Sequence, residues 1–309
     1  MISCKVPSWL ASPPKEIPEF HEEYEARRTH GAEVLDNSVI AVVGLARNCG
    51  PHLAANLVRL SAITSRAKDW RVLIYENDST DDTKQIASSF AAVSPGRGFA
   101  ITRDLGRAER SNEYAGPRTE ALAEYRGECQ EWVRRNFWGS DYTIVIDWDS
   151  WGGWCINGAM TGLSYLATEE DAFGMASVSL LQQPQLSYDS EKQSLTHGTT
   201  WIHYDCWALR LNSYWDDYSN GVGGWKHGWL PMIGSPPLRV CSAFGGFAIY
   251  KTGDFLRGTY SGQDCEHVPF HRSIAERTDR ALYLNPSQRT VMKWIDAKHS
   301  TGTDNALQK

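Results

Sequence analysis

Two carboxylates separated by one residue follow an apolar run in this chain. Residues 143–146 are four consecutive β-branched residues, typical of a buried strand, and Asp147, Trp148 and Asp149 follow directly. Side chains at i and i+2 of an extended backbone point the same way, so Asp147 and Asp149 can share one hard divalent cation while Trp148 faces elsewhere. A cation held by one or two carboxylates keeps positions for phosphate oxygens. The pattern predicts a site for a nucleotide diphosphate.

The same three residues also fit a solvated strand end, because aspartate is common in turns. The prediction therefore depends on other polar groups that the fold could bring to this strand end. Four candidates lie within eight residues near the C-terminus, namely Asp264, Glu266, His267 and His271. Pro269 suits the first turn of a helix, so residues 263–268 should form the loop before it. Carboxylates in such a loop are free to face a ligand.

Further candidates lie after a predicted strand and at the start of a predicted helix. Glu76 and Asp78 follow the apolar run 71–75, where their carboxylates could accept hydrogen bonds from a ribose or a base. Arg118 lies four residues before Leu122, on the inward face of a predicted helix that begins near Pro117. A buried arginine needs an anionic partner, so a strand-end carboxylate or a bound phosphate should lie near Arg118.

The elements that position these residues alternate along the first half of the chain. Continuous apolar runs predict buried strands at residues 38–45, 71–75, 98–103 and 143–146, and helical patterns separate them. This order predicts an α/β fold with a mainly parallel sheet and helices on both faces. In such a sheet ligands bind at the carboxyl ends of the strands, which is where Asp147 and Asp149 stand.

The second half is less regular. A helix is predicted at residues 156–166 and a strand at 173–180, whereas residues 182–240 are rich in Trp, Tyr, Gly and Asn and suit insertions that shape a pocket. A strand at 240–250 is interrupted by Gly245 and Gly246, which would let a ligand or another backbone approach. This half should therefore contribute to the walls of a binding site.

Apart from the two ends, we predict a single domain over residues 38–299, because no linker divides it. Residues 38–150 form the expected nucleotide-binding half, and residues 151–299 the acceptor and catalytic half. Residues 1–37 are expected to form an extended arm with a short polar helix, and residues 300–309 a disordered tail.

Composition narrows the functional classes. The chain has 309 residues, of which 41% are hydrophobic and 22% charged, and its net charge of −6 argues against a nucleic-acid partner. Seven scattered cysteines without a C-x-x-C pair fit reduced thiols. Prolines interrupt the N-terminal region where a signal peptide needs an apolar core, and no run is long enough to cross a membrane. We expect a cytoplasmic protein without a transmembrane segment.

The order of these signals resembles GT-A glycosyltransferases over residues 38–295. The matching features are a first strand that ends at Arg47, the Glu76 segment, the helix with Arg118, Asp147-Trp148-Asp149 in the D-x-D position, Gly245-Gly246 and the acidic, histidine-containing segment. The stretches YENDSTDDT, AGPRTEAL and CEHVPFH are similar to the fungal capsule-associated α-1,3-mannosyltransferase group and its bacterial and viral relatives.

The resemblance implies a GT-A, Rossmann-like fold and transfer of a hexose from a GDP- or UDP-linked donor to a hydroxyl acceptor such as a glycan, with Mn²⁺ or Mg²⁺. It favours retention of anomeric configuration, whereas the residues alone leave retention and inversion open. It further implies that Asp149 ligates the metal and that Asp147 lies near the ribose and the metal. A histidine, either His271 or His267, would complete the coordination. Catalytic residues would be Glu266 or Asp264, and donor-binding residues Arg47, Glu76, Asp78, Arg118, Asp147 and Trp148.

Two other classes fit parts of the pattern. A nucleotidyltransferase shares the parallel sheet and metal carboxylates but usually carries a glycine-rich basic loop after its first strand, which residues 45–50 lack. A non-catalytic carbohydrate-binding protein could use the Trp-rich second half without a metal. Binding of UDP and GDP with and without Mn²⁺ distinguishes these classes.

Overall fold

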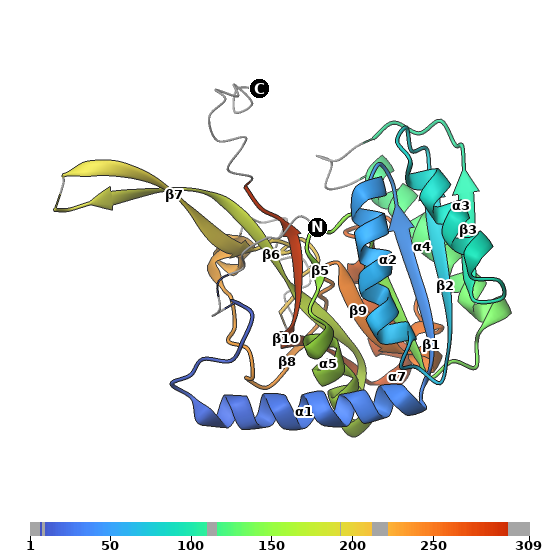
Figure 1. The fold of residues 1–309 in the computed structure, drawn as a ribbon, viewed down its shortest axis with the longest axis horizontal. Helices are drawn as coiled ribbons and strands as arrows, with labels where there is room; N and C mark the ends of the chain where they lie inside the picture. The colour runs from blue at the N-terminus through green and yellow to red at the C-terminus, as the bar shows by residue number, and fades with distance from the viewer. Residues whose placement is uncertain (1–6, 8–9, 110–115, 192, 212–221, 296–309) are drawn as a thin grey trace.

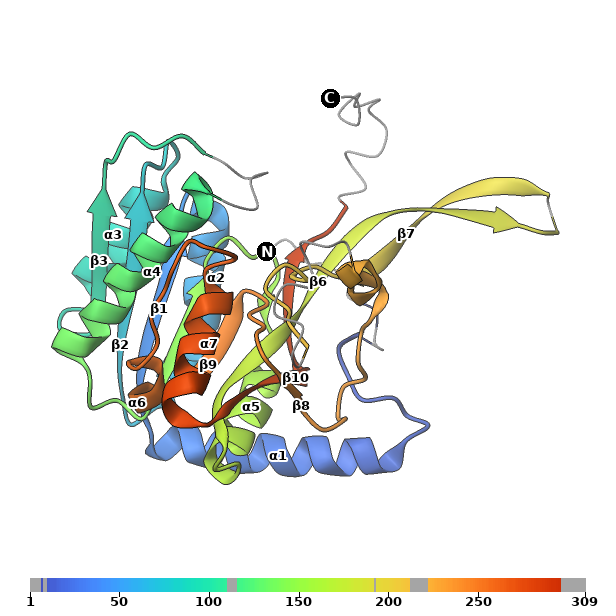
Figure 2. The same ribbon diagram turned by 180° about the vertical axis from the view of Figure 1, so that it is seen from behind.

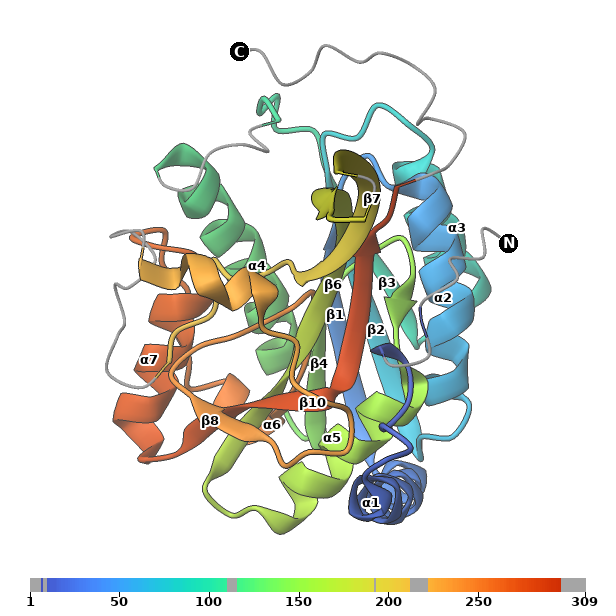
Figure 3. The same cartoon turned by 90° about the vertical axis from the view of Figure 1, so that its left-hand side faces the viewer.

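The computed structural model describes residues 7, 10–109, 116–191, 193–211 and 222–295. Within these residues a ten-stranded sheet forms the centre of the molecule, and helices lie on both of its faces (Figures 1 and 3). The predicted α/β fold with a mainly parallel sheet and helices on both faces is confirmed. None of the described helices is both long and apolar enough to cross a membrane.

The elements follow one another in a strand–helix alternation up to β4 and less regularly thereafter. The helices are α1 (Pro18–Asn37), α2 (Gly50–Thr64), α3 (Thr83–Val93), α4 (Pro117–Asn136), α5 (Ile156–Thr168), α6 (Thr252–Phe255) and α7 (His267–Thr278), with the 3₁₀ helix η2 (Val222–Gly228). The strands are β1 (Val39–Ala46), β2 (Asp69–Asn77), β3 (Gly98–Arg103), β4 (Tyr142–Asp147), β5 (Gly153–Trp154), β6 (Ala172–Asp189), β7 (Ser194–His203), β8 (Leu238–Val240), β9 (Phe247–Lys251) and β10 (Ala281–Lys293).

The strands lie in the order β3-β2-β1-β4-β9-β6-β10-β5, with β7 paired to β6 and β8 paired to β10. The first four strands in this order are parallel. Strand β9 is antiparallel to both β4 and β6, and β10 runs parallel to β6. Strand β9 therefore joins the parallel N-terminal part of the sheet to the C-terminal part.

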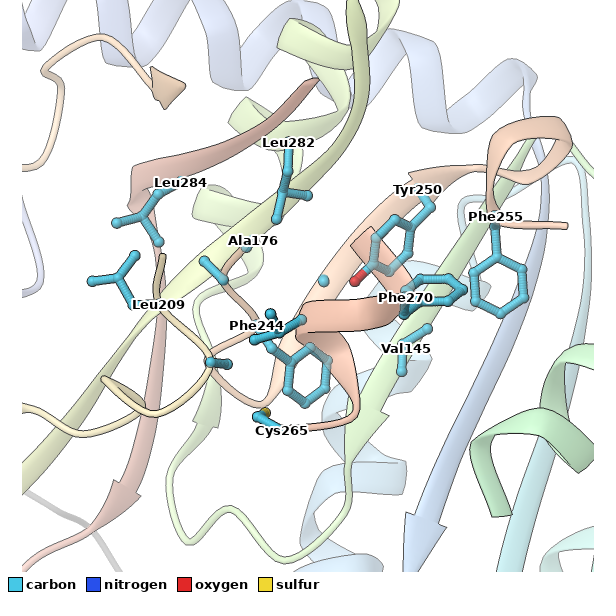
Figure 4. Packing of buried hydrophobic residues seen from close by; sticks show 14 of the residues in the cluster. Val145, Ala176, Leu209, Phe244, Tyr250, Phe255, Cys265, Phe270, Leu282 and Leu284 are labelled. Carbon is cyan, nitrogen blue, oxygen red and sulfur yellow. The ribbon is translucent and has the colours of Figure 1, made fainter. Parts of the chain in front are cut away.

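Alternating side chains of the central strands fill two separate cores. In β1, Ala41 and Val43 pack with the residues of α4 and α7, whereas Ile40 and Val42 pack with those of α2 and α5. Because side chains alternate across a strand, a strand covered on both faces must be apolar at every position. Figure 4 shows part of the first core, including Tyr250 of β9 and Phe270 of α7. The apolar run at 38–45 is thus uninterrupted because helices cover both faces of β1.

The winding of the chain reverses between β1 and β4. Helices α2 and α3 connect β1, β2 and β3 on one face, and α4 then crosses the other face to bring the chain back to β4, beside β1 (Figures 1 and 2). Loops at the carboxyl ends of β1 and β4 consequently leave in opposite directions and open a crevice between them, which is the usual ligand position in such sheets. Asp147 is the last residue of β4.

The N-terminal segment differs from the expected extended arm with a short helix. Helix α1 is 20 residues long and packs along α5 beneath the sheet (Figure 1). Gly31 permits this contact, because a Cβ there would lie 1.7 Å from the carbonyl oxygen of Met160. The predicted tail at residues 300–309 lies outside the described residues.

The second half contains more strand than predicted. Strands β6 and β7 pair beyond the sheet and extend from the body as a two-stranded ribbon (Figures 1 and 2). The predicted strand 240–250 is split into β8 and β9. Strand β10 was not predicted, since Pro286 interrupts its pattern; the structure accommodates this with a register shift between Asn285 and Arg289.

One predicted helix start is also corrected. Helix α7 begins at His267, two residues before the expected position at Pro269. Before α3, the Ser79 hydroxyl accepts a hydrogen bond from the backbone N–H of Asn48 at 3.1 Å, and the α3 N-cap residue, Asp82, makes no side-chain cap. The Ser79 side chain therefore joins the loops after β1 and β2.

Candidate functional site

A cavity of about 730 Å³ opens at the crevice between β1 and β4. Both halves of the chain contribute to it. Its polar and aromatic lining includes Arg47, Asn77, Arg107, Glu109, Arg118, Tyr125, Arg126, Asp147, Asp149, Tyr204, Asp205, Trp207, Phe244, Glu266 and His267. Four arginines and five carboxylates in one cavity suit a ligand that carries negative charge together with a cation.

Asp147 and Asp149 both line this cavity, whereas Trp148 does not. The Trp148 side chain is fully buried on the opposite side of the strand end, where its ring packs edge-on against Trp154 at a centroid distance of 6.3 Å. The prediction that Trp148 contacts a cofactor is therefore wrong, because its side chain fills the core between β4 and α2. Asn56 donates hydrogen bonds to the carbonyl oxygens of Trp148 and Ser150, which holds this turn in place.

The two aspartates repel one another. Desolvation inside the cavity, followed by the neighbouring charge of Asp147, raises the pKa of Asp149 to about 6. Asp147 is compensated by a cation, since Nη2 of Arg126 lies 2.8 Å from its Oδ1. Both carboxylates line the cavity, and Asp149 is the more exposed of the two.

Arg126 connects the two halves of the site. Its Nε donates to Oε1 of Glu266 at 2.7 Å while Nη2 donates to Asp147, and the guanidinium lies 4.8 Å from the ring centre of Phe244. Arg126 is 4% exposed, so both ion pairs are shielded from water. The third nitrogen, Nη1, is buried without a hydrogen-bond partner. Sequence reasoning missed this residue, although its position four residues after Leu122 places a charge on the buried stripe of α4.

The structure separates the two histidines that were predicted as alternative metal ligands. His271 is fully buried, and its ring nitrogens lie 2.9 Å from the hydroxyl oxygens of Ser242 and Tyr250. Both nitrogens are thus occupied inside the core, and His271 does not line the cavity, so this assignment is wrong. His267 lines the cavity and stacks on Phe244, and both of its ring nitrogens are buried without a hydrogen-bond partner.

The two predicted catalytic carboxylates also differ in position. Glu266 lines the cavity, as described above. Asp264 does not line it, because both of its oxygens bind Nη2 of the buried Arg210, at 3.1 and 3.0 Å. Asp264 therefore anchors the loop before α7, and its predicted catalytic role is not supported by its position.

Glu76 and Asp78 do not line the cavity either. Glu76 is fully buried and accepts a hydrogen bond from the backbone N–H of Ser79. Asp78 accepts hydrogen bonds from three successive backbone N–H groups, those of residues 105–107, at 2.6 to 3.2 Å. Hydrogen bonds from these N–H groups and from Asn77 outweigh desolvation and lower the pKa of Asp78. Asp78 thus shapes the loop after β3, and Asn77 between the two carboxylates is the residue that lines the cavity.

The two predicted donor-binding arginines are at the cavity. Arg47 follows β1 and donates to the carbonyl oxygen of Arg107 at 2.5 Å, which ties the loops after β1 and β3 together. Arg118 stands in the first turn of α4 with its guanidinium 5.0 Å from the ring centre of Trp207. The contribution of Arg47 and Arg118 to donor binding stays a prediction.

Asp205 is a second cavity residue that the sequence did not suggest. It follows β7, and its Oδ2 accepts a hydrogen bond from the backbone N–H of Gly245 at 2.8 Å. Gly245 has a φ of 71°, and a Cβ there would lie 2.1 Å from the carbonyl oxygen of Ser177. The glycine is thus required by the close approach of a neighbouring backbone. Desolvation by burial is the main cause that raises the pKa of Asp205 to about 6.

The residues present are compatible with Mg²⁺ or Mn²⁺. Within the described ranges, no group of three or more His, Cys, Asp or Glu side chains is arranged to hold a metal ion. Asp147 and Asp149 provide two carboxylates, which suffices for a cation that takes its other ligands from phosphate and water. The unpartnered ring nitrogens of His267, one of them 3.5 Å from Glu266, add a donor in the same cavity.

The buried histidines predict a pH dependence of stability. Burial lowers the pKa of His203 and of His271 to about 3, below the ordinary value of about 6.5. Between these values the unfolded chain binds more protons, so the free energy of unfolding falls as the pH drops below about 6.5. Relative to about pH 7.5, we expect a loss of about 2 kcal/mol per histidine at about pH 5.

Urea unfolding at these two pH values measures this effect. In His271→Gln, which cannot take up the proton, about 2 kcal/mol of the pH dependence should disappear. His197→Gln, in the exposed part of the ribbon, is the matched control and should keep the wild-type dependence. An unchanged dependence in His271→Gln would contradict the assignment of His271 as a buried neutral residue.

Comparison with protein-family models found no match for this sequence, and comparison with curated proteins found none either. Solved structures do match. A mannosyltransferase from Pyrobaculum calidifontis in complex with GDP-Man and Mn²⁺ is 11% identical with a TM-score of 0.47, and the match covers 88% of this chain and 65% of that chain. GalNAc-T7 with UDP, GalNAc and Mn²⁺ is 11% identical with a TM-score of 0.47, over 94% of this chain and 55% of that chain.

A third match is glucosyl-3-phosphoglycerate synthase from Mycobacterium tuberculosis in complex with Mn²⁺, UDP and phosphoglyceric acid. It is 11% identical with a TM-score of 0.46, over 88% of this chain and 73% of that chain. This chain therefore spans less than two thirds of the length of the first two proteins. At such low identity the function has to be argued from the site itself.

Proposed function

We propose that this protein is a metal-dependent glycosyltransferase that moves a hexose from a GDP- or UDP-linked donor to a hydroxyl acceptor such as a glycan. The observation that supports it best is the position of Asp147 and Asp149. They stand at the carboxyl end of β4, beside the switch between β1 and β4, in a cavity large enough for a nucleotide sugar.

The charges around the cavity suit a diphosphate. A bound Mn²⁺ or Mg²⁺ would neutralise charge that develops on the leaving diphosphate. Asp149 would be its direct ligand and Asp147 would lie beside it, with His267 as the nearest additional donor. Arg118 and Arg47 would face the phosphates from the two sides of the crevice, because both line the cavity. Asn77, at the end of β2, would face the nucleoside.

The second half of the chain contributes a carboxylate to the same cavity, from the residue that precedes α7. Glu266 lines the cavity and is fixed by Arg126, so its carboxylate would be held beside a donor sugar bound there. In a retaining enzyme a carboxylate there would stabilise positive charge on the sugar ring. The sequence resemblance to mannosyltransferases supports two further parts of the proposal. These are retention of anomeric configuration and transfer of a hexose such as mannose.

Isothermal titration with UDP and GDP, each with and without Mn²⁺, tests the proposal. We expect one nucleotide to bind only when the metal is present, because two carboxylates and a diphosphate must share it. A screen of nucleotide sugars for metal-dependent hydrolysis then identifies the donor. Binding of neither nucleotide, with or without Mn²⁺, would exclude a nucleotide-sugar transferase. Release of pyrophosphate from a nucleoside triphosphate and a sugar phosphate would indicate a nucleotidyltransferase instead.

A further inference from the structure

Five carboxylates of the described residues line the cavity, and their environments differ. They are Glu109, Asp147, Asp149, Asp205 and Glu266. Asp147 and Glu266 are both ion-paired with Arg126. Glu109 receives a hydrogen bond from Asn48, beside the loops after β1 and β2, on the nucleotide side of the cavity. With Asp149 reserved for a cation, Asp205 is the carboxylate without an assigned task.

The bonds of Asp205 leave it able to accept more. Within the described part of the chain its carboxylate accepts hydrogen bonds from the backbone N–H groups of Gly245 at 2.8 Å and Ala208 at 3.4 Å, and it forms no ion pair. A carboxylate has about four acceptor positions, so two remain. Its own backbone N–H donates to the hydroxyl of Ser179 at 2.9 Å, which fixes the residue to β6. Asp205 is thus a rigid acceptor of hydrogen bonds in the cavity wall.

Two aromatic residues flank this carboxylate on the same segment. Tyr204 and Trp207 both line the cavity, and Tyr204 is 48% exposed. Aromatic rings offer flat apolar faces to the C–H faces of sugars, while carboxylates accept hydrogen bonds from sugar hydroxyls. The segment that carries them follows β7 and belongs to the half of the chain opposite β1 and β2. A sugar bound against it would lie across the cavity from the nucleotide side.

We infer that Asp205 binds the attacking hydroxyl of a carbohydrate acceptor, between Tyr204 and Trp207. This inference rests on the proposed function and assigns the acceptor side of the same cavity. The acceptor hydroxyl donates a hydrogen bond to Asp205, which turns the hydroxyl oxygen toward the donor sugar. Asp264 does not line the cavity and is held by Arg210, and Glu266 is ion-paired with Arg126, so Asp205 is the better acceptor for this hydrogen bond.

The test compares donor binding with transfer in Asp205→Asn. This variant keeps the volume and an oxygen for the N–H of Gly245 but removes the charge. With Mn²⁺ present, we expect nucleotide affinity to stay at the wild-type value, while transfer to methyl mannoside, methyl glucoside or methyl galactoside falls about 100-fold, because the hydrogen bond from the acceptor to a charged group is lost. Asp69→Asn is the matched control, since Asp69 is the first residue of β2, at the end of the strand opposite to the cavity, and does not line it. It should leave both quantities unchanged.

The outcomes separate the inference from the proposed function. Transfer by a folded Asp205→Asn variant at the wild-type rate overturns the inference. Loss of nucleotide binding in that variant overturns it as well, because Asp205 would then act on the donor. If circular dichroism shows that Asp205→Asn does not fold, Asp205→Ser is used, whose hydroxyl can still accept from Gly245. A wild-type protein that transfers to none of the three methyl glycosides refutes a carbohydrate acceptor. Absence of nucleotide binding by the wild type refutes the proposed function itself.

Discussion

Asp149→Asn is expected to abolish metal-dependent nucleotide binding and to reduce transfer by about 1000-fold or more. The reason is that a catalytic cation contributes several kcal/mol of charge stabilisation, and each 1.4 kcal/mol is a factor of ten in rate. Asp149 is the more exposed carboxylate of the pair in the cavity, whereas Asp147 is already paired with Arg126. Titration of the variant with GDP and UDP, each with and without Mn²⁺, measures the effect.

The same substitution should not destabilise the protein. It removes one of two neighbouring negative charges, so the free energy of unfolding at neutral pH is expected to stay the same or rise. A loss of binding together with unchanged or higher stability indicates a functional role, because it cannot result from damage to the fold. A variant that binds nucleotide with the wild-type Mn²⁺ dependence would falsify the metal assignment. Asp69→Asn again serves as the control for a carboxylate-to-amide change.

Arg126→Met should be the most destabilising single substitution at the site. It removes the cation between Asp147 and Glu266 and leaves their charges uncompensated where Glu266 is only 2% exposed. Breaking a buried ion pair by removal of one partner costs about 3–5 kcal/mol. Urea unfolding of the variant measures this loss. Transfer should fall as well, because Asp147 and Glu266 lose the group that holds them in position.

Two further variants show whether the ion pairs are the cause. Arg135→Met lies on the same helix, but its arginine is 75% exposed and bonded to Glu131, so the change should cost less than about 0.5 kcal/mol. Arg126→Met combined with Glu266→Gln should recover part of the lost stability, since one uncompensated charge is removed. Equal stability of Arg126→Met and Arg135→Met would show that Arg126 does not hold the two halves together.

The positions of the strand-end residues could be predicted because they depend on local sequence. A strand between two helical layers must be apolar at every position, so the runs that form β1, β2 and β4 are visible without a structure. The carboxylates that follow such a run stand at its carboxyl end whatever the rest of the chain does. This is why Asp147 and Asp149 after β4, and Arg47 after β1, were found at the cavity.

The direction in which the other side chains point could not be predicted in this way. Arg118 and Arg126 lie eight residues apart on the same face of α4, and helical periodicity alone does not distinguish them. The tertiary structure distinguishes the two arginines. Glu266 is 140 residues away from Arg126 in the sequence and pairs with it only because α7 packs beside α4. In the same way, His271 meets its partners from β9 and from the segment before it inside the core, and His267 is left to face the cavity.

The sequence by itself therefore determined the α/β alternation and the strand end that carries the aspartates, because both follow from hydrophobic periodicity and backbone geometry over a few residues. The tertiary structure decided which charges compensate one another and which remain open to the cavity. Three residues that the sequence assigned to the site are held elsewhere. Trp148 is packed in the core, Asp264 is bound by Arg210, and Asp78 is bound by backbone N–H groups. Asp205 lies in the site because strands distant in sequence pair with one another. This pairing brings the backbone N–H of Gly245 within hydrogen-bond distance of the Asp205 carboxylate.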